Sequence, residues 1–135
     1  MRTAAEIESL IAAFERCTLP KVEWTHREHL TVALWYLCRH PRAEATHLIR
    51  SGIQRYNLAT NNPTGYHETI TLAWVAVITR FLAERGTVMD SAAATAALLN
   101  ECGDKLYLLQ YYSREVLMSD AARHGWVAPD VMPLP

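Results

Sequence analysis

Helix-start signals recur along this chain while signals for β-strands are nearly absent, and this contrast constrains the fold more than any other feature. In a capping box, a Ser or Thr and an acidic residue three positions later satisfy amides that the first helical turn leaves without partners. Thr3 and Glu6 match one such box. Thr25 and Glu28 match a second one. We therefore expect helices to begin at both places.

Apolar spacing and helix-ending residues divide the chain into five or six helices. The first helix carries apolar residues at i, i+3, i+4 and i+7 and ends near Pro20. The run from Leu30 to Cys38 is apolar nearly all round, which predicts a central, enclosed second helix. The other predicted segments are a third helix after Pro41, a fourth from about Tyr66 or His67 to Arg85 with Gly86 beyond its end, a fifth from Asp90 or Ser91 to near Gly103, a sixth from Lys105 to about Leu117, a final turn at Ser119 or Asp120, and an extended tail over 126–135.

The overall composition fits one domain of this kind. The chain has 135 residues, of which 50% are hydrophobic, and this is enough for a core without disulfides or a structural metal. A net charge of -1 excludes a basic clamp for nucleic acid. No apolar stretch reaches about 18 residues, so we expect no membrane-spanning helix. The sequence predicts a single, bundle-like all-α domain over 1–135.

The cysteines and the first residues bear on where the protein resides. Acidic residues interrupt the apolar run that a secretory signal would need near the start of the chain. Cys17, Cys38 and Cys102 are odd in number and widely spaced, which is typical of reduced thiols packed as small hydrophobic groups. We therefore expect a cytoplasmic protein, with homo-oligomer formation left open.

Two histidines stand at the start of the second predicted helix. His26 and His29 are spaced i, i+3, which puts both side chains on one helical face. Apolar residues continue that face, so both rings should point to the interior. The positive end of a helix disfavours imidazolium, and the neutral ring is the form that binds a metal or acts as a base.

A second cluster, Gly65-Tyr66-His67-Glu68-Thr69, opens the fourth predicted helix. His67 leads that helix's apolar stripe and should also point inward. Glu68 is offset by about 100° around the helix. Its carboxylate could serve as a metal ligand, a general base, or the acceptor that orients a histidine. The two clusters would meet if the second and fourth helices begin at the same end of the bundle.

Together the clusters predict a mononuclear metal centre with His26, His29, His67 and Glu68 as ligands. This donor set suits Zn, Fe, Ni or Cu, with one position open for water or substrate. Glu68 would then be the catalytic residue, acting as a general base toward a metal-bound water in a metal-dependent hydrolase or oxidoreductase. No glycine-rich loop indicates a nucleotide cofactor.

The alternative leaves the metal out, because each histidine taken singly is also explained as a helix-start donor or a hydrogen-bonded core group. The chain would then be a helical module that binds a small ligand or a protein partner through an aromatic-rich pocket. The other three histidines, His40, His47 and His124, fall in turns or on a polar face. Tyr111 could instead pack in the core, and Arg114 could instead be a solvated surface residue. The residues that would contact a small molecule are Trp24, Tyr66, Trp74, Tyr111 and Arg114.

The same motifs carry a family resemblance. The patterns W-x-H-x-x-H-L, at Trp24 to Leu30, and G-Y-H-E-T, at Gly65 to Thr69, resemble those of a family of small, uncharacterised bacterial all-helical proteins. The Tyr111-Tyr112-Ser113-Arg114 segment extends the similarity toward the Trp126 tail. The resemblance implies that the two histidine motifs lie together in the fold, and it names no substrate.

Overall fold

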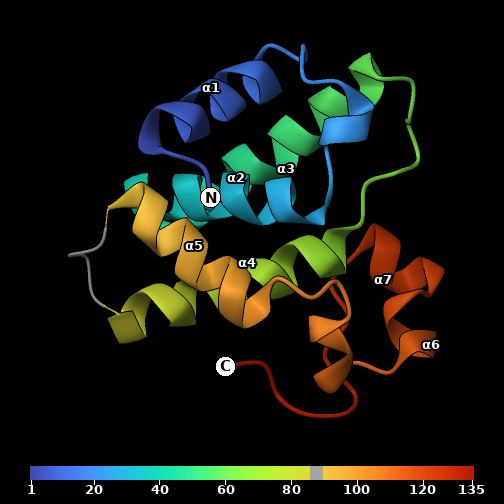
Figure 1. The fold of residues 1–135 in the computed structure, drawn as a ribbon. Helices are drawn as coiled ribbons and strands as arrows, with labels where there is room; N and C mark the ends of the chain where they lie inside the picture. The colour runs from blue at the N-terminus through green and yellow to red at the C-terminus, as the bar shows by residue number, and fades with distance from the viewer. Residues whose placement is uncertain (86–89) are drawn as a thin grey trace.

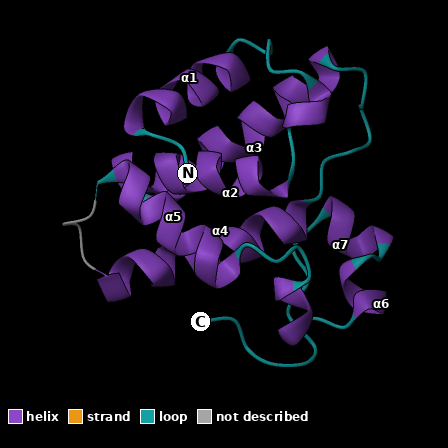
Figure 2. Ribbon diagram, viewed as in Figure 1, coloured by secondary structure: helices purple, strands orange, loops and turns teal. Residues whose placement is uncertain are grey.

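The computed structural model describes residues 1–85 and 90–135, and every regular element within these ranges is a helix (Figures 1 and 2). The predicted all-α class is therefore confirmed. The helices are more numerous than the five or six expected, because the C-terminal third is divided into short pieces. They are α1 (Ala4–Glu15), η1 (Lys21–Glu23), α2 (His26–Arg39), α3 (Arg42–Ala59), α4 (Glu68–Arg85), α5 (Ser91–Cys102), η2 (Tyr107–Gln110), α6 (Arg114–Leu117) and α7 (Asp120–His124).

Helix α2 lies at the centre of the molecule and packs against α1, α3, α4 and α5 (Figure 1). Its sequence explains this position, since a helix with apolar side chains on all sides must be covered on all sides. The consecutive residues Leu30 to Leu34 are all buried. The predicted enclosed helix is thus confirmed as far as Tyr36, while Leu37 is half-buried and Cys38 is exposed.

The two predicted capping boxes start α1 and α2. The Glu6 amide donates to Thr3 Oγ1 at 3.2 Å, and the Thr3 amide donates to Glu6 Oε1 at 3.0 Å. At the start of α2 the Thr25 amide donates to Glu28 Oε1 at 3.2 Å. This second box fixes the first turn of α2 and therefore the direction in which its two histidines leave the helix.

The predicted sixth helix is not continuous. Residues Tyr107–Gln110 form the 3-10 helix η2, and α6 starts only after Ser113. The break has a local cause, because Ser113 Oγ accepts from the Val116 amide at 3.2 Å as the N-cap of α6. The Ser113 amide is held by Asp130 Oδ1 at 2.8 Å, so the tail takes part in the break.

Two further expectations have plain outcomes. Cys102 is buried and Cys17 is half-buried, but Cys38 is exposed near the end of α2, so its prediction as a packed thiol is wrong. The expected helix-ending Gly86 lies outside the described residues. Within the described ranges, none of the helices is long and apolar enough to cross a membrane.

Candidate functional site

A pocket of about 490 Å³ lies where the starts of α2 and α4 meet the second half of α3. His26, His29 and His67 all line it. The expectation that the two histidine motifs lie together is therefore confirmed. Aliphatic side chains from α2, α3 and α4 form much of its wall, namely Leu30, Ala33, Ile49, Ile53 and Ile70.

Aromatic rings pack against two of the histidines that line the pocket. The Trp24 ring stacks on the buried Phe14 with centroids 4.8 Å apart, and the His29 ring lies against Trp24 at 3.8 Å. In a second contact, the centroid of the His26 ring is 5.2 Å from that of Trp74. Since these contacts tie the rings to the core, the pocket walls are formed before any ligand arrives.

His29 presents a single free nitrogen. Its Nδ1 lies 2.9 Å from the carbonyl oxygen of Thr25, and because a carbonyl only accepts, Nδ1 must carry the proton. Burial lowers the pKa of His29, so the ring is neutral and Nε2 keeps its lone pair. In the described part of the chain no donor reaches Nε2, and it is not among the fully buried unpartnered atoms. This nitrogen is therefore an acceptor within reach of a bound molecule.

His26 and Trp24 each hold a polar nitrogen away from water. The Nε2 of His26 and the Nε1 of Trp24 are fully buried and have no hydrogen-bond partner among the described residues. Burial lowers the pKa of His26, which keeps its ring neutral as well. Such unpaired buried groups cost about 1–3 kcal/mol each. Among the described residues, two of the four such atoms belong to residues that line this pocket, and the other two, on Trp35 and Thr79, lie elsewhere.

His67 uses both of its ring nitrogens for structure. Its Nδ1 accepts from the Ile70 amide at 3.0 Å, which caps the start of α4. Its Nε2 donates to the Leu117 carbonyl oxygen at 2.7 Å, which ties α4 to α6. Burial lowers the pKa of this ring too. Neither nitrogen retains a free lone pair, so His67 contributes ring carbons to the pocket rather than a ligand atom.

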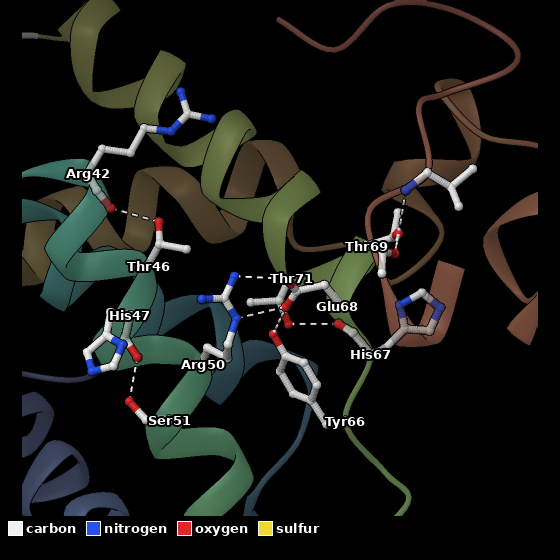
Figure 3. Close-up of polar contacts among 12 residues, drawn as sticks. Arg42, Thr46, His47, Arg50, Ser51, Tyr66, His67, Glu68, Thr69 and Thr71 are labelled. Carbon is white, nitrogen blue, oxygen red and sulfur yellow. Dashed lines mark hydrogen bonds and ion pairs between the residues drawn. The ribbon is translucent and has the colours of Figure 1, made fainter. Parts of the chain in front are cut away.

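Glu68 points away from the pocket toward α3. Its carboxylate accepts two hydrogen bonds from Arg50, Nε at 2.9 Å and Nη2 at 2.8 Å, and one from the Tyr66 hydroxyl at 2.5 Å (Figure 3). The bonds from Arg50 are the main cause that lowers the pKa of Glu68. Burial is the main cause that raises the pKa of Tyr66 to about 12. A carboxylate held by three donors is a structural anchor and a weak base.

The predicted four-residue metal centre is therefore not assembled from its members. Among residues 1–85 and 90–135, no three His, Cys, Asp or Glu side chains are placed to hold a metal ion. Of the predicted ligands, His29 and His26 each keep a ring nitrogen, Nε2 and Nδ1 respectively, that has no hydrogen-bond partner among the described residues and is not fully buried. Of the residues predicted to contact a small molecule, Trp24, Tyr66 and Trp74 line the pocket. Tyr111 is buried elsewhere and Arg114 is exposed, and neither lines it.

Sequence reasoning missed Asn57, which lies in the pocket wall with only 7% of its surface exposed. Its side-chain amide makes no hydrogen bond to any described residue, and neither of its polar atoms is among those fully buried without a partner. Its position gave a signal, because Asn57 is four residues beyond Ile53 and eight beyond Ile49, on the buried face of α3. A polar residue on that face needs a partner, and the pocket is where a ligand could supply one.

In comparisons with known proteins, no family model, no curated protein and no solved structure matched this chain. The resemblance carried by the two histidine motifs stays a prediction.

Proposed function

We propose that this protein binds a small, largely apolar molecule in the pocket between α2, α3 and α4, without a metal ion. The observation that carries the proposal is the chemistry of the pocket wall. An aromatic and aliphatic surface surrounds polar groups that no described residue satisfies, among them His29 Nε2 and the Asn57 side-chain amide. Binding sites for small molecules combine an apolar wall with a few placed polar groups in this way, and about 490 Å³ is within their usual range.

The metal-centred hypothesis has less support. For His67 to bind a metal, it would have to give up either the cap of α4 or its bond to Leu117. Glu68 would have to leave Arg50, which would then stay half-buried without its partner. A ligand that fills the existing pocket requires neither change.

The test is a titration of ¹⁵N-labelled protein with 2-methoxynaphthalene, followed through the indole N–H signals of the tryptophans. Trp24 and Trp74 line the pocket, so their signals should move together with a single dissociation constant. Trp126 is 50% exposed and lies outside the pocket, so its signal should stay in place. Movement of Trp126 alone, or of no signal, would count against the proposal.

A matched pair of variants sharpens the same titration. Ala33 is 6% exposed and lines the pocket, so Ala33→Leu should fill part of it and weaken binding about tenfold or more. Ala121 is exposed on α7, and Ala121→Leu makes the same chemical change away from the pocket. Equal effects of the two substitutions would show that the probe binds elsewhere.

A further inference from the structure

We propose that the pocket selects planar, uncharged rings that carry an O–H or N–H group, and that His29 Nε2 accepts the hydrogen bond from this group. This inference rests on the proposed function, because it names the class of molecule that the same pocket takes. Aromatic alcohols and N–H heterocycles are the simplest members of the class.

The selection for a donor follows from the tautomer of His29. Because Nδ1–H is committed to the Thr25 carbonyl at 2.9 Å, the neutral ring offers only a lone pair at Nε2. A ligand that brings another acceptor to this point would leave two lone pairs facing each other. Sites that hydrogen-bond a ligand O–H or N–H reject analogues without it, since the buried protein group is then left unpaired.

The direction of that lone pair is fixed by two contacts. The Nδ1 bond sets the ring's position against the first turn of α2, and Trp24 covers it with centroids 3.8 Å apart. Trp24 is in turn stacked on Phe14, which is completely buried. Because this acceptor is fixed in direction, it favours ligands whose O–H or N–H group reaches the right position in the pocket.

Asn57 adds a second group of complementary character. The side-chain amide of Asn57 offers both a hydrogen-bond donor and an acceptor. The backbone carbonyl oxygen of Asn57 already accepts a hydrogen bond from the Asn62 amide at 2.8 Å. The Asn57 side chain can therefore pair with an oxygen or nitrogen elsewhere on the ligand ring. A purely hydrocarbon ligand would leave both Asn57 and His29 unsatisfied.

The charge of the wall favours an uncharged ring. Of the described residues that line the pocket, Lys21 alone carries a charge at neutral pH, and it is exposed. The nearby Arg50 is bound to Glu68, and Arg123 donates to backbone carbonyls of Thr64 and Tyr66 at 3.2 Å. An ionised ring would be desolvated in the pocket without a partner, which is costly.

The preference for a planar ligand follows from the aromatic rings in the pocket wall. Trp24 and Trp74 both line the pocket and belong to two aromatic clusters, one with His29 and the other with His26 and Tyr107. Ring faces offer their largest contact area to another flat ring, and they gain most from offset stacking.

The experiment compares 2-naphthol with 2-methoxynaphthalene, which differ in the hydroxyl hydrogen and one methyl group. Dissociation constants are measured by calorimetry for the native chain and for His29→Phe, which keeps a flat ring against Trp24 and removes the acceptor. The control is His47→Phe, because His47 is exposed on α3 and lies outside the pocket.

We expect the native chain and His47→Phe to bind 2-naphthol about three- to tenfold more tightly than its methyl ether, which is the size of one hydrogen bond. In His29→Phe the two probes should bind equally. Equal binding by the native chain would overturn this inference while leaving the pocket as a binding site. If neither probe bound the native chain, the proposed function itself would fail.

A second readout needs no variant. The ¹⁵N signal of His29 Nε2 in the native protein should move toward its hydrogen-bonded position when 2-naphthol is added, and should not do so with the methyl ether. The same movement with both probes, or with neither, would overturn the role given to this nitrogen.

Discussion

At the scale of single residues, three inward-facing histidines have different roles because their ring nitrogens meet different partners. Both ring nitrogens of His67 are hydrogen-bonded, one to the Ile70 amide and one to the Leu117 carbonyl oxygen. In His29 only Nδ1 is hydrogen-bonded, to the Thr25 carbonyl oxygen. His26 keeps a buried nitrogen with no described partner. Residue spacing predicts that all three point inward, but it carries no information about Leu117, which lies 50 residues from His67 in the chain. The sequence therefore allows the candidate residues to be predicted, but it does not allow their individual roles to be predicted.

Because the His67 ring caps α4 and hydrogen-bonds to α6, removing it should cause a large loss of stability. His67→Ala should lower the free energy of unfolding by about 2–4 kcal/mol, because it removes two hydrogen bonds and leaves buried partners unpaired. Urea unfolding followed by circular dichroism measures this. His47→Ala, at an exposed position, should change stability by less than about 0.5 kcal/mol. Similar losses in both variants would contradict the assignment.

Between elements, Arg50 and Glu68 connect α3 to the start of α4 (Figure 3). The sequence offers no sign of this pair, since the two residues belong to different helices and face each other only in the folded chain. By contrast, the capping boxes of α1 and α2 were predictable, because their partners are three residues apart. Local signals therefore define most helix starts, and the pairing between helices decides what Glu68 does.

A double-mutant cycle tests the connection. Arg50→Met and Glu68→Gln should each lower the free energy of unfolding, and the pair should show a coupling energy of about 1–2 kcal/mol. Charge-assisted, bidentate geometry in a half-buried place is the reason for a value above that of ordinary surface ion pairs. Additive effects within about 0.3 kcal/mol would show that the two side chains act independently.

The close approach of α1 and α3 gives a second prediction at this scale. A Cβ at Gly52 would lie 2.8 Å from the ring of Phe14, which is fully buried and has Trp24 on one side and Tyr56 on another. Gly52→Ala should therefore destabilise the protein by about 1–3 kcal/mol, although the same change usually favours a helix. Thermal unfolding checks this, and a raised midpoint would mean that Phe14 is free to move.

The C-terminal third shows where element prediction fails. Its sequence is rich in Leu and Tyr and suggests one helix, but η2 and α6 are separated at Ser113. The break combines the local N-cap at Ser113 with a contact to Asp130, 17 residues away, and helical periodicity cannot reveal the second. The tail also holds this segment through hydrogen bonds from the Val131 and Met132 amides to the Tyr111 carbonyl oxygen.

For the molecule as a whole, the three histidines that line the pocket make the free energy of unfolding depend on pH. The pKa values of His26, His29 and His67 are all lowered by burial from the ordinary value of 6.5. As the pH falls below 6.5, the three histidines take up protons in the unfolded chain, while their rings stay neutral in the folded chain. The free energy of unfolding should therefore decrease from this pH downward, and it should change little from histidine titration above it.

Urea unfolding at a series of pH values checks this, with His26→Phe as the comparison. This variant lacks one of the three histidines with a lowered pKa, so its free energy of unfolding should decrease less steeply below pH 6.5. A further loss is expected below pH 4.5, where the lowered pKa of Glu68 adds its own contribution. A flat profile between pH 7.5 and 5.5 would contradict the assignment of neutral buried rings.

The central claim is that the pocket between α2, α3 and α4 binds a flat ring through His29. A crystal structure of the protein soaked with 2-naphthol tests it most directly. The account predicts the naphthol ring beside Trp24, with its oxygen within hydrogen-bonding distance of His29 Nε2. An empty pocket at saturating probe, or a ring bound with its oxygen away from His29, would contradict it.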